Sequence, residues 1–178
     1  MKVDRVLLVG LGSIGKRHLG NLQRLLPKAK IALLRSRRGM GAIEGCVTVE
    51  SLDEALNFQP QVAFICSPSS FHLSVAIELA KARVHLLIEK PLSNKSKGII
   101  EFIEVVRHEK IKVMVGYNLR FSPSLIALRE LVRSQKFGRA LYVSAGVGQY
   151  LPDWRPEVHY RLTVSSKSEL GGGALLEL

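Results

Sequence analysis

The stretch VDRVLLVGLGSIGKRH, residues 3–18, decides the fold. Its first half is a short apolar run, and its second half has glycines at positions 10, 12 and 15 in the pattern G-x-G-x-x-G. An apolar run that is too short for a helix and is ended by glycine predicts a strand. The pattern therefore stands between a predicted strand and a predicted helix, as it does in a dinucleotide-binding unit.

The three glycines have separate physical roles in such a unit. Gly10 permits the tight turn, Gly12 lets the backbone approach a pyrophosphate, and Gly15 lets the helix pack closely on the strand. The backbone amides at the helix start, which include those of Ser13 and Ile14, would then face the phosphates. The alternative is a tight strand–helix turn that holds no ligand, and the surrounding pattern favours the dinucleotide.

Strand and helix patterns alternate along the first two thirds of the chain. Fully apolar strands that alternate with helices are typical of a parallel sheet covered on both faces. We therefore expect an α/β fold with a doubly wound parallel sheet of the Rossmann type. The expected strands are 5–9, 31–34, 46–49, 62–66, 84–88 and 112–116, and the expected helices are 13–26, 51–56, 69–82 and 93–109.

The pattern changes near residue 120, where we place a domain boundary. Beyond it we expect a helix at 122–135, a longer strand at 140–151 and then an irregular segment rich in turn residues. Residues 1–120 would form the dinucleotide-binding domain. Residues 121–178 would begin an incomplete α+β domain that serves substrate binding and oligomerisation.

Positive charge is concentrated at the N-terminus of a chain whose net charge is +11. A unit that binds NAD places Asp or Glu about 20 residues after the glycines, where it holds the ribose 2′-OH. This sequence has Arg35, Ser36, Arg37 and Arg38 there instead. Guanidinium groups suit a 2′-phosphate, so we predict NADP as the cofactor, with NAD as the alternative. A solvated basic loop is the other interpretation.

Several classes of protein are disfavoured by composition. No apolar run approaches the roughly 20 residues that span a bilayer, and the N-terminal run lacks a signal-peptide cleavage site. We expect a cytoplasmic protein with no membrane partner. The two cysteines, Cys46 and Cys66, lack metal or disulfide spacing, so no metal is predicted. The basic N-terminus could attract nucleic acid, but it has no groove-reading motif, so we expect no nucleic-acid partner.

Three further motifs follow strand ends: SPSSFH at 67–72, EKP at 89–91 and NLRFSP at 118–123. Ligands of such sheets bind at the carboxyl ends of strands. Together with the glycine pattern, a Trp-Arg pair and a glycine triplet, these motifs resemble the glucose–fructose oxidoreductase/inositol dehydrogenase family, often called Gfo/Idh/MocA. The stretch from Gln149 onward looks most like a branch found among sugar and nucleotide-sugar oxidoreductases.

The resemblance implies a role for each matched residue. Lys90 would be catalytic, because it would reach the substrate hydroxyl and act in acid–base chemistry. His72 could instead have only a polar role at a helix start, and Trp154 could be an ordinary loop anchor. We expect His18 to pack in the first helix rather than touch a ligand, and Cys66 to be a small buried residue rather than a nucleophile. Cofactor contacts are implied for Gly10, Gly12, Ser13, Ile14, Gly15, Cys66, Ser67, Pro68, His72, Glu89, Lys90, Asn118, Arg120, Trp154 and Arg155.

The chain departs from the family pattern after the glycine triplet. In the family, that triplet begins a helix that carries an acid and then a histidine, which partners the EKP lysine. Here Glu177 stands where the acid belongs, and the histidine is absent. We expect a piece of a longer protein that binds the cofactor with weak or no turnover.

The whole protein would transfer a hydride between nicotinamide and a carbinol carbon of a sugar, nucleotide-sugar or polyol. We expect it to be a homo-oligomer that acts on a small sugar-like substrate. The alternative function is a non-catalytic sensor that binds NADP and signals through a partner.

Overall fold

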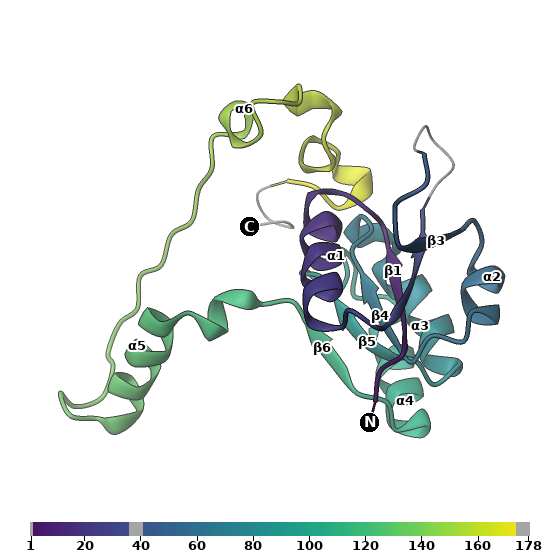
Figure 1. The fold of residues 1–178 in the computed structure, drawn as a ribbon. Coiled ribbons are helices and arrows are strands. Elements are labelled where there is room, and N and C mark those ends of the chain that lie inside the picture. The colour runs from purple at the N-terminus through teal and green to yellow at the C-terminus, as the bar shows by residue number, and fades with distance from the viewer. Residues whose placement is uncertain (1, 36–40, 174–178) are drawn as a thin grey trace.

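A parallel sheet of six strands forms the centre of the computed structural model, which describes residues 2–35 and 41–173 (Figure 1). The strand order is β3-β2-β1-β4-β5-β6, and every neighbouring pair is parallel. This is the doubly wound order of a dinucleotide-binding sheet, so the predicted fold class is confirmed. The strands are β1 (Arg5–Val9), β2 (Lys30–Leu34), β3 (Cys46–Val49), β4 (Val62–Ile65), β5 (His85–Ile88) and β6 (Val113–Val115).

Helices cover both faces of the sheet because successive strand residues point to opposite faces. In β1, Val6 and Leu8 belong to the same buried cluster as residues of helix α1 (Ser13–Leu25). Leu7 and Val9 belong to the other cluster, which helices α2 (Leu52–Asn57), α3 (His72–Lys81) and α4 (Ile99–Glu109) complete. The inner strands are therefore largely buried on both sides, as their continuous apolar runs predict. The edge strands β3 and β6 are more open, and Val47 and Met114 are exposed there.

Two helix starts show how local bonds set the boundaries. At α2 the Ser51 hydroxyl accepts a hydrogen bond from the Glu54 amide at 3.1 Å, which caps the start of this helix. The prediction of a helix from residue 93 was wrong at its start, since α4 begins only at Ile99. The Ser93 hydroxyl accepts a bond from the Lys95 amide at 3.1 Å, and this local bond competes with helix formation.

The second part of the chain extends away from the sheet. It has a short 3-10 turn, η2 (Asn118–Phe121), and then helix α5 (Pro123–Ser134), which confirms the helix predicted there. The predicted strand at 140–151 is absent: residues 138–150 have no regular structure, and Leu151–Trp154 form the short helix α6. A strand needs a hydrogen-bonded neighbour, and none of the described residues pairs with this segment.

The chain then returns toward the sheet through three more 3-10 turns, Tyr160–Leu162, Val164–Ser166 and Ser168–Leu170. The buried hydrophobic core lies between Val6 and Ile111, and the domain division near residue 120 stays a prediction. Among the described residues, none of the helices has the length and apolar character to cross a membrane.

Candidate functional site

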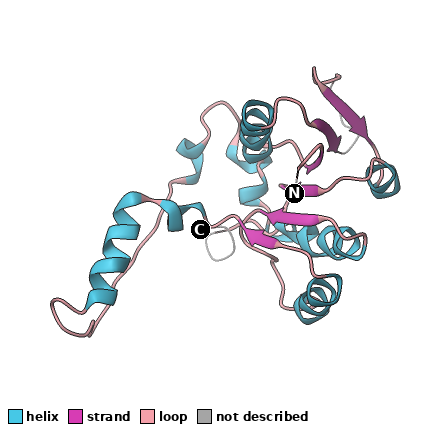
Figure 2. Cartoon of the chain, turned by 60° about the horizontal axis from the view of Figure 1, so that its bottom comes forward, coloured by secondary structure: helices cyan, strands magenta, loops and turns pink. Residues whose placement is uncertain are grey.

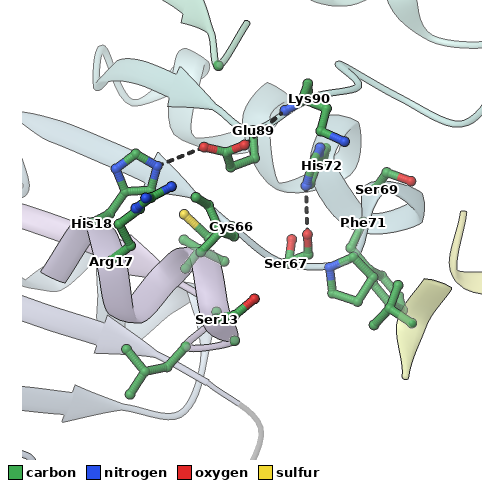
Figure 3. Close-up of a pocket in the computed structure, with 18 of the residues that line it drawn as sticks. Ser13, Arg17, His18, Cys66, Ser67, Ser69, Phe71, His72, Glu89 and Lys90 are labelled. Atoms are coloured by element: carbon green, nitrogen blue, oxygen red, sulfur yellow. Dashed lines mark hydrogen bonds and ion pairs between the residues drawn. The ribbon is translucent and has the colours of Figure 1, made fainter. Parts of the chain in front are cut away.

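A large pocket of about 1440 Å³ opens at the carboxyl ends of the strands (Figure 3). The loops that follow β1, β4, β5 and β6 all line it, and Trp154, Arg155, Val164, Leu170 and Gly171 line it from the returning segment. The strand order reverses direction between β1 and β4. A ligand of an open α/β sheet binds at such a reversal.

The glycine turn brings the loops after β1 and β4 into contact. Gly10 has a φ of +88°, and a Cβ on it would lie only 2.8 Å from the backbone nitrogen of Ser67. A Cβ on Gly15 would collide with the carbonyl oxygen of Gly10. A Cβ on Gly12 would meet no atom within 4 Å. Two glycines therefore close the turn, and the third leaves open space in front of the helix.

The N-terminus of α1 presents an anion-binding surface to the pocket. Gly12 is the N-cap residue, no side chain caps the helix, and its first turn contains no acidic residue. The first amides of a helix have no intrahelical partner and carry a partial positive charge. Ser13 and Ile14 line the pocket here, and Arg17 adds a full positive charge one turn later. Phosphate groups fit this arrangement.

The basic cluster after β2 is described only in part. Arg35 lines the pocket, and one nitrogen of its guanidinium donates a hydrogen bond to the carbonyl of Gly41 at 2.6 Å. Ser36, Arg37 and Arg38 lie outside the described residues. The assignment of this cluster to a 2′-phosphate therefore stays a prediction.

The EKP motif at the end of β5 faces the glycine turn across the pocket. Glu89, Lys90 and Pro91 all line it. The Nε2 atom of His18 lies 2.7 Å from Oε1 of Glu89, and Figure 3 shows the two side chains pointing toward each other. His18 does pack on a neighbour, the Phe64 ring, but it also lines the pocket, which differs from what the sequence led us to expect.

Cys66 lies in the pocket wall beside this pair and is buried. Burial, together with the negative charge of Glu89, raises the pKa of the Cys66 thiol to about 12. A thiol with such a pKa stays protonated near neutral pH and is a poor nucleophile. The prediction of a small buried residue at a strand end is confirmed.

His72 lines the pocket but uses both ring nitrogens on the backbone. Its Nδ1 lies 2.9 Å from the carbonyl oxygen of Pro91, and its Nε2 lies 2.7 Å from that of Ser67 (Figure 3). The ring is almost fully buried. Its two nitrogens therefore connect the loops after β4 and β5. This favours a polar role in holding the loops over a hydrogen bond to the cofactor.

Ser67 and Pro68 line the pocket next to this histidine. The hydroxyl oxygen of Ser67 is buried, and it has no hydrogen-bond partner within the described part of the chain. Buried hydroxyl groups are nearly always bonded. The atom is therefore a candidate contact for a ligand in the pocket.

The residues predicted beyond β6 divide into two groups. Asn118, Trp154 and Arg155 line the pocket, and the Arg155 guanidinium lies 5.2 Å from the centre of the Trp154 ring. Arg120 is exposed and does not line the pocket; its guanidinium lies 5.9 Å from the centre of the Phe121 ring.

The sequence interpretation missed other lining residues. Arg17 and Asn21 follow Ser13 at intervals of one helical turn, so helical periodicity could have found them. Val164, Leu170 and Gly171 arrive through the return of the chain, which no local pattern signals. The other lining residues that were missed are Val9, Leu11, His18, Leu34, Glu50, Ser69, Phe71, Pro91 and Gly116.

Residues 5–117 match the model of an oxidoreductase family with an NAD-binding Rossmann fold. The chain belongs to this Gfo/Idh/MocA family. The match covers the sheet and the glycine, SPSSFH and EKP motifs that line the pocket.

Proteins similar to this chain include dehydrogenases that act on inositols. An uncharacterized oxidoreductase, YrbE of Bacillus subtilis, is 30% identical over 139 residues, which are 74% of this chain and 40% of that protein. An inositol 2-dehydrogenase of Rhizobium meliloti is 28% identical over 143 residues, 77% of this chain and 43% of that protein.

Among solved structures, scyllo-inositol dehydrogenase of Lactobacillus casei with bound NAD(H) and scyllo-inositol has a TM-score of 0.65 and 26% identity. The match covers 77% of this chain and 43% of that one. The chain thus spans less than half the length of each of these three proteins.

Proposed function

We propose that the whole protein is an NADP-dependent oxidoreductase and that this chain forms its cofactor-binding part. The substrate would be a sugar, nucleotide-sugar or polyol, oxidised or formed at a carbinol carbon. One observation carries the proposal: the glycine turn at α1 and the EKP motif at β5 line the same pocket. Family membership and the inositol dehydrogenases among the relatives support it.

The residues present fit a nicotinamide dinucleotide. Gly12 leaves open space in front of an uncapped helix N-terminus, as a pyrophosphate requires. Ser67, whose hydroxyl has no hydrogen-bond partner among the described residues, lines the same pocket. Arg35 at the end of β2 supports a 2′-phosphate and hence NADP, because a guanidinium makes charge-assisted bonds to phosphate.

The chemistry divides between cofactor and protein. Nicotinamide, when bound, supplies a hydride acceptor or donor. Lys90 would hold the substrate hydroxyl and move its proton, which is general acid–base catalysis. Ile14, Pro68 and Phe71 line the pocket and would give a bound cofactor an apolar surface to pack against. From this chain alone we propose cofactor binding with turnover below about 1 per second, the lower end of ordinary enzymes.

A fluorescence titration tests the proposal. Trp154 is the only tryptophan of the chain and lines the pocket, so its emission should report a bound reduced nicotinamide. We expect NADPH to bind at least about tenfold more tightly than NADH, a difference of about 1.4 kcal/mol. Arg35→Ala should weaken NADPH and leave NADH unchanged.

A matched pair of glycine variants distinguishes binding at the glycine turn before α1 from nonspecific binding elsewhere. Gly12→Val would fill the open space before α1, whereas Gly146→Val changes a glycine that also has no atom near its Cβ position but does not line the pocket. Only Gly12→Val should abolish binding. Equal binding of NADPH and NADH would replace NADP by NAD in the proposal, and binding of neither would refute it.

A further inference from the structure

Two elements enclose the carboxylate of Glu89: helix α1 and the segment just after β6. His18 of α1 approaches Oε1 to 2.7 Å. Gly116, just after β6, lies against the other side: a Cβ at this position would be 3.0 Å from Oε1 and 3.1 Å from Oε2. Any larger residue at position 116 would therefore press on the carboxylate. The packing leaves the carboxylate little freedom to rotate.

The His18 side of this contact is also fixed. Its ring packs against the Phe64 ring, with centroids 5.3 Å apart and planes inclined by 55°. The side chains of His18 and Glu89 are only 18% and 14% exposed. A hydrogen bond to a carboxylate that is largely shielded from water is stronger than one at the surface. The pair is therefore a defined geometry rather than a transient surface contact.

The two oxygens of Glu89 have different surroundings. Oε1 accepts a hydrogen bond from His18. Among the described residues, Oε2 has only a long contact, 3.4 Å, with the amide of Lys90. Glu89 itself lines the pocket. A carboxylate has lone pairs for several donors, so Oε2 is the oxygen available to a ligand.

We propose that His18 is a positioning residue that holds Glu89 so that Oε2 accepts a hydrogen bond from the nicotinamide half of the bound dinucleotide. The donor would be an N–H or O–H group of the carboxamide or the adjoining ribose. This inference rests on the proposed function. It makes α1 act at two places, since its N-terminus faces the phosphates and its second turn orients the EKP carboxylate.

The test compares two ligands and two substitutions by calorimetry. His18→Phe keeps a ring against Phe64 but has no donor, whereas His18→Gln keeps a donor. NADPH carries the nicotinamide half, and 2′,5′-ADP lacks it. We expect His18→Phe to weaken NADPH about tenfold and leave 2′,5′-ADP unchanged, and His18→Gln to bind NADPH within about threefold of the original chain. An equal loss for both ligands would mean a structural role and would overturn the inference.

A double-mutant cycle tests whether His18 acts through Glu89. In a Glu89→Ala background, which removes the acceptor of the His18 bond, His18→Phe should cause no further loss of NADPH affinity, and an undiminished loss would overturn the inference. Gly116→Ala gives an independent route, because its Cβ should displace the same carboxylate and reproduce the His18→Phe result. If the original chain binds NADPH and His18→Phe binds it equally well, only this inference fails. If the original chain binds no dinucleotide, the proposed function fails as well.

Discussion

Two regions of this chain are similarly rich in apolar residues and use them in opposite ways. The sheet region, residues 5–115, buries them between strands and helices. The arm, residues 118–150, leaves them exposed: Leu8 of β1 is 0% exposed and Leu128 of α5 is 53% exposed. Figure 2 shows α5 standing apart from the sheet. The difference teaches that an apolar side chain contributes to stability only where another surface of the molecule packs against it.

The same difference explains where the pocket lies. Its walls come from loops of the sheet region and from the returning segment after Leu151, and the arm supplies only Asn118. The returning segment is attached to the sheet region by specific contacts, such as the bond from the Ser69 hydroxyl to the Gly171 carbonyl at 3.4 Å. Ligand binding should therefore depend on the sheet region and the returning segment far more than on the arm.

The largest expected effect comes from truncating one leucine in each region. Leu8→Ala removes a side chain that is packed on all sides and should lower the free energy of unfolding by about 2–5 kcal/mol. Leu128→Ala removes a half-exposed side chain and should change it by less than about 0.5 kcal/mol. Urea unfolding followed by circular dichroism measures both. A loss at Leu128 equal to that at Leu8 would show that the arm is packed in solution and would remove the contrast.

The sequence predicts the secondary structure of the sheet region better than that of the arm. All six strands of the sheet were found because each is a short apolar run that is too short for a helix. β1 was found with its glycine turn. The run at 140–151 is also apolar, but strand formation depends on a partner segment, which a local pattern does not reveal.

The candidate site was predictable where a motif adjoins a strand end and less so elsewhere. Glu89 and Lys90 follow β5 directly, so their place in the pocket follows from the fold. The partner of Glu89 does not follow in this way, because His18 is 71 residues away and meets it only through packing of α1 on the sheet. His72 lines the pocket, but its bonds to two backbone carbonyls depend on the course of both loops, which the sequence does not reveal.

A smaller effect is expected from two alanine substitutions within α1, where the same contrast exists between two faces of one helix. A Cβ on Gly15 would collide with the Gly10 carbonyl, so Gly15→Ala should lower the free energy of unfolding by about 2–3 kcal/mol and weaken NADPH binding. Gly20 is exposed and has no atom within 4 Å of its Cβ position. Gly20→Ala should raise stability by about 0.5–1 kcal/mol, because alanine favours helix. Thermal unfolding of both variants measures these changes. If Gly15→Ala left the free energy of unfolding unchanged, α1 would pack less closely on the turn than the structure shows.

The smallest expected effect, and the most local test of the contrast, concerns the reactivity of the two thiols. Cys66 is buried beside Glu89 and its pKa is raised to about 12, whereas Cys46 on the edge strand β3 is only partly buried. Because the thiolate is the reactive form, Cys66 should stay almost entirely protonated and slow to react at pH 8. Iodoacetamide should therefore modify Cys46 first. As the pH is raised toward the pKa of Cys66, the alkylation rate at Cys66 should increase about tenfold for each pH unit. Glu89→Gln removes the neighbouring negative charge, so it should lower the pKa of Cys66 and speed its alkylation, which peptide mass spectrometry can follow. A Cys66 that reacts as fast as Cys46 at pH 8 would show that the pocket wall beside Glu89 is open to solvent.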